Sequence, residues 1–214
     1  MDAEFWLNCW QNNHLGFQLD APHPMLVAAL PQLPRVDKVF VPLCGKSPDL
    51  HFLSEHFNVV GSELSAIACR DFFAEADLHP TESTLAEHRC FQHNRISLWQ
   101  GDFFTLPSAI VSEITLIYDR AALIALPSEL RLRYVQSLRR NLPSATLLLI
   151  SLEYPQDEKA GPPFSVSATE IAQLFAGAEI RLLEEIDLTG VGFARRKFLT
   201  SQLVEKSWLI RWRA

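Results

Sequence analysis

The amino-acid sequence predicts an α/β protein with a mostly parallel, seven-stranded sheet, helices on both faces and an antiparallel hairpin at its C-terminal end. Short apolar runs alternate with segments in which apolar residues recur at helical spacing. Strands that are buried on both faces and separated by helices are typical of a parallel sheet. The last two strand-like segments have no helical pattern between them, which indicates a closing hairpin.

The segments that predict strands are apolar and rich in β-branched residues. They cover residues 36–43, 58–61, 96–99, 114–118, 145–152, 180–188 and 206–213. The first (VDKVFVPL) and the fifth (ATLLLISL) are apolar along nearly their whole length, as expected for strands that are buried on both faces.

Helices are predicted between these strands by start signals and by periodic apolar residues. Ser47, Pro48 and Asp49 supply an N-cap, a proline at the first helical position and an acid in the first turn. Ser167 and Glu170 form a capping-box pattern before another helix. Helical periodicity also predicts helices over residues 2–10, 65–76 and 127–141.

The N-terminal residues 1–30 are expected to form a helical extension of a single domain that spans residues 1–214. One side of its first helix collects four apolar side chains, those of Phe5, Trp6, Cys9 and Trp10. In this class of fold, ligands bind in a crevice at the carboxyl ends of the strands. We therefore expect the first helix to close over that crevice as a lid.

Composition excludes several classes of function. The chain has 214 residues, of which 48% are hydrophobic and 21% charged, as in an ordinary globular protein. Its net charge of −6 disfavours binding to nucleic acid, because phosphates would be repelled. No apolar run approaches the roughly 18 residues of a membrane span, and the first residues lack the positive flank of a signal peptide. We expect a cytoplasmic protein with no membrane partner.

The cysteines do not predict a metal or redox site. Cys9, Cys44, Cys69 and Cys90 include no pair at CxxC spacing. In a cytosolic protein such residues are expected to be reduced and mostly buried.

Four candidate binding positions follow four successive predicted strands. Gly45, in the turn PLCGKS, lets the chain turn sharply and lets a ligand approach the backbone. Glu63 is placed to accept hydrogen bonds from ribose hydroxyls. Asp102 is placed to receive an adenine amino group, with Phe103 against the ring face. Arg120 would hold a carboxylate or stabilise a negative acceptor atom.

Each of these positions also has a purely structural interpretation. The glycine is a turn residue, and Glu63 is an exposed acid at a strand end. Asp102 caps a turn beside two core phenylalanines, and Asp119 with Arg120 forms a surface ion pair of little energetic consequence. Together, however, a glycine, a ribose acid and an adenine acid outline a nucleoside site. Because the turn holds one glycine and not the three of G-x-G-x-x-G, the pattern favours S-adenosylmethionine over NAD.

Five motifs extend this reading to a family. In chain order they are VPLCGKS at 41–47, GSELS at 61–65, GDFF at 101–104, YDRAALIALP at 118–127 and GPPFSV at 161–166. The opening, with Phe5-Trp6, Trp10-Gln11 and Gly16-Phe17, adds to them. Over nearly the whole chain, to about Leu188, these segments resemble the thiopurine S-methyltransferase family in its bacterial form.

The resemblance implies a Rossmann-like class I fold of the S-adenosylmethionine-dependent methyltransferases, S-adenosylmethionine as cofactor, a monomer and no metal. It matches cofactor contacts to Trp10, Leu43, Glu63 and Arg120, with Leu43 acting through its backbone. It matches the lining of the same pocket to Trp6, Phe17, Gly45, Asp102 and Phe103. On the acceptor side it implies Phe17, Pro163, Phe164 and Arg195, with Arg196 an alternative to Arg195. Gln18 departs from the family, since many members have histidine there.

The expected reaction is in-line methyl transfer to the thiolate of a small aromatic or heterocyclic thiol. Alignment of the reacting groups and exclusion of water are expected to supply most of the catalysis. No general base is assigned, and Arg120 is a candidate thiolate stabiliser. Three alternatives remain: an inactive module that binds S-adenosylmethionine, a methyltransferase for selenium or tellurium species, and an NAD-dependent oxidoreductase.

Overall fold

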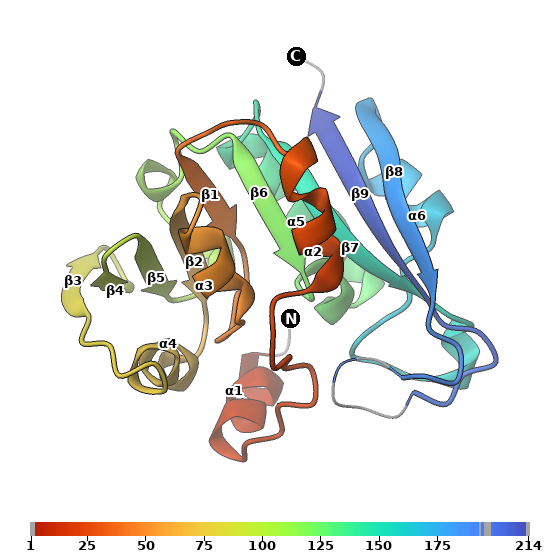
Figure 1. Ribbon diagram of the computed structural model, residues 1–214, viewed down its shortest axis with the longest axis horizontal. Helices are drawn as coiled ribbons and strands as arrows, with labels where there is room; N and C mark the ends of the chain where they lie inside the picture. The colour runs from red at the N-terminus through yellow and green to blue at the C-terminus, as the bar shows by residue number, and fades with distance from the viewer. Residues whose placement is uncertain (1–2, 193, 195–197, 213–214) are drawn as a thin grey trace.

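A computed structural model describes residues 3–192, 194 and 198–212, and these form one nine-stranded sheet in the order β3-β4-β5-β2-β1-β6-β7-β9-β8 (Figure 1). The strands are β1 Lys38–Val41, β2 Asn58–Glu63, β3 Thr81–Leu85, β4 His88–His93, β5 Ile96–Gln100, β6 Leu116–Arg120, β7 Thr146–Glu153, β8 Ala178–Asp187 and β9 Val204–Trp212. The strands β5, β2, β1, β6 and β7 are parallel, and β9 and β8 continue the sheet as an antiparallel pair. The predicted fold class and the closing hairpin are confirmed.

The seven predicted strands are all present, but the prediction missed two more. The hairpin β3–β4 pairs with β5 and widens the sheet to nine strands. Strand β3 (TESTL) is exposed along its whole length, so it shows no apolar face in the sequence. Its turn uses Ala86 at φ +52° in place of glycine, which removes the usual hairpin signal.

One strand boundary matters for the site. The fourth predicted strand ended at Tyr118, whereas β6 continues through Arg120. Asp119 and Arg120 pair with Leu149 and Ile150 of β7, so the ladder continues past the last apolar residue. Both charged residues are therefore held in the sheet rather than in the loop that follows it.

The helices are α1 Ala3–Gln11, α2 Pro24–Ala29, α3 Asp49–Ser54, α4 Ala66–Ala74, α5 Ser128–Asn141 and α6 Ala168–Leu174. Short 3-10 turns are η1 Leu30–Gln32, η2 Phe103–Thr105, η3 Ser108–Ile110, η4 Leu123–Ala125 and η5 Gln156–Glu158. The hydroxyl of Ser167 accepts the N–H of Glu170 at 3.1 Å, which confirms it as the N-cap of α6. Ser47 lies one residue before the N-cap position of α3, and its hydroxyl accepts the N–H of Asp49 at 3.2 Å.

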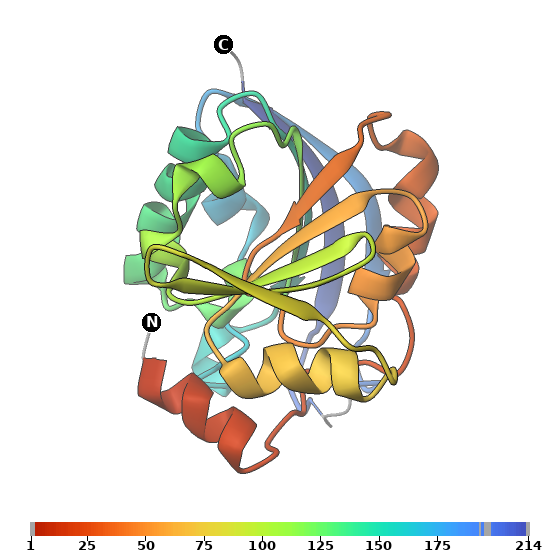
Figure 2. The same cartoon turned by 90° about the vertical axis from the view of Figure 1, so that its left-hand side faces the viewer.

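Two cores cover the two faces of the sheet, as predicted. On one face, Val39, Val41 and their neighbours pack against α2, α3 and α4. On the other, alternate residues such as Phe40 and Ile117 pack against α5 and α6. Figure 2 shows helices on both sides of the twisted sheet. Each fully buried large apolar side chain contributes about 1.5–3 kcal/mol to folding.

A buried polar chain links the N-terminal extension to this core. The Nδ1 of His23 accepts the N–H of Met25, so Nε2 carries the proton and donates to Glu205 of β9 at 3.2 Å. The carboxylate of Asp49 accepts the backbone N–H of His23 at 2.7 Å and the hydroxyl of Tyr118 at 2.9 Å. These contacts fix the start of α2 against α3, β6 and β9.

Helix α1 lies at the edge of the sheet toward which β1 and β6 point (Figure 1) and packs against α4. It is therefore positioned to cover the carboxyl ends of the parallel strands. All four cysteines fall in the described part of the chain, and each is buried and outside any disulfide, as predicted. Among the described helices, none has both the length and the apolar character needed to cross a membrane.

Candidate active site

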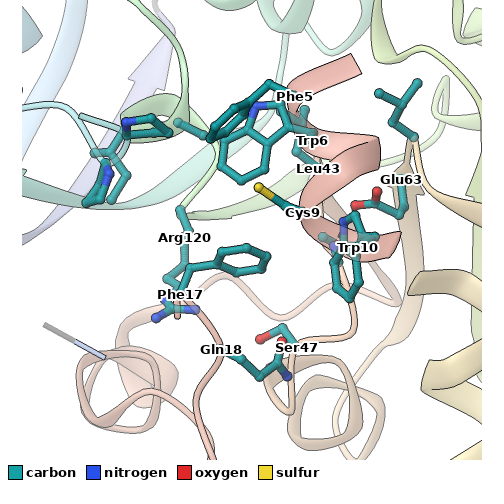
Figure 3. A pocket seen from close by; sticks show the side chains of 18 residues that line it. Phe5, Trp6, Cys9, Trp10, Phe17, Gln18, Leu43, Ser47, Glu63 and Arg120 are labelled. Atoms are coloured by element: carbon teal, nitrogen blue, oxygen red, sulfur yellow. Dashed lines mark hydrogen bonds between the residues drawn. The ribbon is translucent and has the colours of Figure 1, made fainter. Parts of the chain in front are cut away.

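A largely apolar cavity opens at the carboxyl ends of β1, β2 and β6, beneath α1 (Figure 3). It is lined by many of the predicted site residues, namely Trp6, Trp10, Phe17, Leu43, Gly45, Glu63, Arg120 and Pro163. These residues come from segments that lie far apart in the sequence. The fold therefore brings most of the predicted constellation into one place.

The floor of the cavity is made by the turns after β1 and β2, which are hydrogen-bonded to each other. The Oε2 of Glu63 accepts the backbone N–H of Gly45 at 2.8 Å, and its Oε1 accepts the N–H of Ser65 at 2.7 Å. Leu43 and Gly45 have φ angles of +48° and +54°, which turn the chain back under the cavity. Glu63 and Gly45 are thus joined directly by a hydrogen bond between the two turns.

Burial raises the pKa of Glu63, and the backbone N–H groups of Ser65 and Gly45 partly offset that effect. Each carboxylate oxygen accepts one of these two hydrogen bonds and has a further lone pair. The side chain lines the cavity. Glu63 is therefore placed to accept hydroxyl groups from a ligand.

Aromatic rings from the N-terminal segment form the opposite wall. The ring of Phe17 meets those of Trp6 and Trp10 edge to face, each at a centroid distance of 5.7 Å. Trp10 also lies over the floor, because a Cβ on Gly45 would stand 3.2 Å from its Cζ2. Glycine at position 45 thus lets the tryptophan ring approach the turn.

The segment that carries Phe17 is tied down beside the cavity. The side chain of Gln18 donates from Nε2 to the backbone oxygen of Lys46 at 2.7 Å. Lys46 follows Gly45 in the turn PLCGKS. Gln18 therefore connects the segment that carries Phe17 to the floor, a contact that the sequence alone did not reveal.

Asp119 and Arg120 occupy different surroundings, although they are neighbours in β6. The Oδ2 of Asp119 accepts the hydroxyl of Tyr134 on α5 at 2.7 Å, and its Oδ1 accepts the N–H groups of Ala122 and Leu123. Burial raises the pKa of Asp119 to about 6. Of the two, Arg120 lines the cavity, and its side chain is also buried. The surface ion pair considered from the sequence is replaced by a core carboxylate and a cavity cation.

The side of the cavity where the acceptor is predicted to bind is bounded by the loop that contains Pro162 and Pro163, both of which line the cavity. The hydroxyl of Tyr154 donates to the carbonyl oxygen of Pro163 at 2.6 Å and so supports this wall. Phe164, predicted at the same rim, does not line the cavity. Its N–H donates to the oxygen of Ile124 at 2.7 Å, and its ring centroid lies 5.7 Å from the guanidinium carbon of Arg131.

Two further predicted residues, Asp102 and Phe103, do not belong to the lining of the cavity. Asp102 is exposed, and its Oδ1 accepts the N–H of Phe104 at 2.9 Å, so it caps the turn as in the structural interpretation. Phe103 is buried and stacks on Phe40 at 6.4 Å in the core. Their cofactor contacts stay predictions. Arg195 and Arg196 fall outside the described residues.

Sequence reasoning missed several lining residues. Ile124 and Ala125 belong to the motif YDRAALIALP, which signalled the segment but not which of its side chains face the cavity. Cys9 was assigned to the apolar side of the first helix, and Figure 3 shows its sulfur directed into the cavity. Cys44 also lines it from the floor.

The comparisons with known proteins identify the family. The model of the family described as "Thiopurine S-methyltransferase (TPMT)" matches residues 1–213. This chain belongs to the thiopurine S-methyltransferase family. Proteins named thiopurine S-methyltransferase agree: that of Vibrio vulnificus (strain YJ016) is 49% identical over 193 residues, covering 86% of this chain and 87% of the relative. That of Vibrio cholerae (strain ATCC 39541) is 43% identical over 215 residues, covering 98% and 97%.

Solved structures agree on the fold. A SAM-dependent methyltransferase from Anabaena variabilis superposes with a TM-score of 0.71 at 21% identity, covering 99% of this chain and 95% of that one. The N-terminal domain of EvdMO1 with SAH bound gives a TM-score of 0.61 at 11% identity, covering 100% and 98%. As a member of the thiopurine S-methyltransferase family, the protein is an S-adenosylmethionine-dependent methyltransferase, and S-adenosylmethionine is its cofactor.

Proposed function

We propose that this methyltransferase acts on a small aromatic or heterocyclic thiol of the thiopurine type, by in-line transfer to the thiolate. The observation that carries the proposal is that Glu63 and Arg120 line the same apolar cavity (Figure 3). The carboxylate suits the ribose of a nucleoside, and the guanidinium suits an anionic acceptor. A flat, apolar acceptor matches the prolines and aromatic rings around them.

The chemistry of the lining fits the cofactor. When bound, S-adenosylmethionine supplies a methyl group on a positively charged sulfur. In this proposal, Glu63 holds the ribose hydroxyls, and the backbone of Leu43 meets the amino-acid portion of the cofactor. The rings of Trp10 and Phe17 favour positive charge at the cavity wall. The unit formed by Gly45 and Glu63 supports this placement, because a side chain at position 45 would crowd Trp10.

On the acceptor side, Arg120 lowers the pKa of a bound thiol and thereby favours the thiolate. A heterocyclic thiol is acidic enough to ionise partly near neutral pH, so the proposal needs no general base. Phe17, Pro163 and the loop up to Phe164 shape the acceptor space. The lid, residues 1–30, excludes water while the reacting atoms are aligned.

We further propose a monomeric, cytoplasmic protein that consists of one methyltransferase domain over residues 1–214. The net charge of −6 supports the absence of a nucleic-acid partner. The small-molecule thiol is then the only partner that the reaction requires besides the cofactor.

The proposal is tested by incubating the full chain with S-adenosylmethionine carrying a labelled methyl group and with a thiopurine. Transfer of label to the thiopurine sulfur is the expected result, and the matching oxopurine should stay unlabelled. Arg120→Ala should lower turnover and weaken cofactor binding. Calorimetric binding of S-adenosylhomocysteine without thiol methylation would overturn the thiol assignment. Methylation of selenite or tellurite in that case would favour the alternative acceptors.

A further inference from the structure

The hairpin that the sequence did not predict brings one buried histidine to the edge of the proposed cofactor site. His88, the first residue of β4, is 2% exposed. Its Nε2 lies 3.0 Å from the carbonyl oxygen of Asp102. Because a carbonyl oxygen only accepts, Nε2 carries the proton, and the ring is a donor at this position.

The imidazole also packs directly against Gly101. A Cβ on Gly101 would overlap Cδ2, Nε2 and Cγ of the His88 ring. The ring therefore occupies the space that a side chain at position 101 would fill. Glycine at position 101 therefore lets the His88 ring pack directly against the backbone that leads into Asp102.

The Gly101-Asp102 segment is in turn bonded to the floor of the cavity. The N–H of Gly101 donates to the carbonyl oxygen of Glu63 at 2.8 Å, and the side chain of Gln100 donates to that of Leu64 at 3.1 Å. Both Glu63 and Leu64 line the cavity. An adenosyl group held by Glu63 would thus lie close to the Gly101-Asp102 segment, which is itself packed against His88.

The hydrogen bonding of the second ring nitrogen of His88 indicates that histidine is not the most stabilising residue at this position. Nδ1 is buried and has no hydrogen-bond partner in the part of the chain that the structure describes. Leaving a buried polar atom unpaired lowers stability, and an apolar side chain would avoid that loss. Features that reduce stability in this way are expected where a site requires them.

We propose that His88 is a positioning residue for the adenine end of the cofactor. Its Nε2–H donates to the carbonyl oxygen of Asp102 and its ring packs against Gly101. In this proposal, these two contacts hold the Asp102 side chain in the position where it accepts the adenine amino group. The inference rests on the proposed placement of adenine beside Asp102. His88 itself touches neither cofactor nor acceptor.

The test measures binding of S-adenosylhomocysteine to the purified full chain by calorimetry, so it does not depend on turnover. His88→Leu keeps bulk under Gly101 but removes the donor, whereas His88→Gln keeps an N–H donor at a similar distance from the backbone. We expect His88→Leu to raise Kd by about tenfold or more and His88→Gln to stay within about threefold of the parent. The matched control is His93→Ala, which removes a histidine at the far end of β4 whose Nδ1 lies 3.2 Å from the oxygen of His79. It should leave Kd unchanged.

A second readout separates positioning from general destabilisation. The analogue in which the adenine amino group is replaced by oxygen should bind the parent protein about tenfold more weakly than S-adenosylhomocysteine, because that oxygen cannot donate a hydrogen bond to the Asp102 side chain. In His88→Leu this discrimination should largely disappear. A general loss of stability would lower the affinity for both ligands and would not remove the difference between them.

The outcomes are distinct for the two proposals. If the parent protein does not bind S-adenosylhomocysteine, the proposed site and this inference both fail. If the parent binds but His88→Leu retains its affinity and its discrimination between the two ligands, the inference about His88 fails while the proposed function stands. If His88→Leu loses affinity for S-adenosylhomocysteine and His88→Gln keeps it, the result supports both the proposed cofactor site and the inference about His88.

Discussion

The carboxylate of Glu63 accepts the backbone N–H of Gly45, which lies on a different turn, at 2.8 Å. This contact joins the turn after β1 to the turn after β2. The proposed ribose acceptor is therefore oriented by the protein itself. Preorganisation of this kind reduces the entropy that ligand binding must overcome.

Replacing Glu63 with glutamine should weaken both this contact and the site. One of the two accepting oxygens becomes an NH₂ group, which would face the N–H of Gly45 or that of Ser65. We expect Kd for S-adenosylhomocysteine to rise by at least about thirtyfold, equivalent to about 2 kcal/mol. Calorimetry checks this, with Glu179→Gln on the exposed side of β8 as a control that should bind like the parent. An unchanged Kd would contradict the ribose assignment.

Gly45→Ala should separate backbone strain from crowding in the cavity. Gly45 has φ +54°, and a Cβ there would lie 3.2 Å from Trp10. Gly177 has φ +81° and nothing within 4 Å of its Cβ position. Both alanine variants should lose about 1 kcal/mol, or roughly 2–4 °C in Tm.

Only Gly45→Ala should also weaken binding of S-adenosylhomocysteine, because the tryptophan ring must move. Thermal unfolding and calorimetry on both variants check this. Equal binding by Gly45→Ala and Gly177→Ala would show that the position of Trp10 over the turn is unimportant for the ligand.

Gln18→Ala should loosen the lid without altering the floor. The variant loses the 2.7 Å hydrogen bond from Gln18 to the oxygen of Lys46, and with it the anchor of the segment that carries Phe17. We expect S-adenosylhomocysteine to dissociate about five- to tenfold faster, which corresponds to roughly 1 kcal/mol. Stopped-flow tryptophan fluorescence measures that rate. Gln173→Ala, on the exposed side of α6, is the control, and equal rates in the two variants would refute the anchor.

The pH dependence of stability should carry a contribution from Asp119. Its pKa is raised from 3.8 to about 6 by burial, so the folded state binds a proton more tightly than the unfolded state. Stability from this group is therefore present below about pH 4 and is lost as the pH rises to about 6. The loss is on the order of 3 kcal/mol.

Asp119→Asn removes this titration. Urea unfolding at several pH values should show the variant gaining stability relative to the parent between about pH 4 and pH 6. A difference between the two proteins that does not vary with pH would contradict the raised pKa.

Local patterns in the sequence were sufficient for the elements whose physics is local. The runs VDKVFVPL and ATLLLISL are apolar because both faces of β1 and β7 are covered, and that composition is visible without a structure. The N-cap of α6 was equally visible at Ser167. The motifs around Gly45, Glu63 and Arg120 predicted many of the residues that line the cavity, because the carboxyl ends of the strands in a parallel sheet meet at one edge.

The tertiary structure decided what depends on contacts between distant residues. Strand β3 is held by pairing with β4 and not by an apolar face, so its polar sequence gave no strand signal. Asp119 turns toward Tyr134 while Arg120 lines the cavity, a separation that follows from alternation along a strand whose end the sequence placed too early. Periodicity reports the environment of one element at a time. Which side chains meet across elements, as His88 meets Gly101, is set only when the chain is packed.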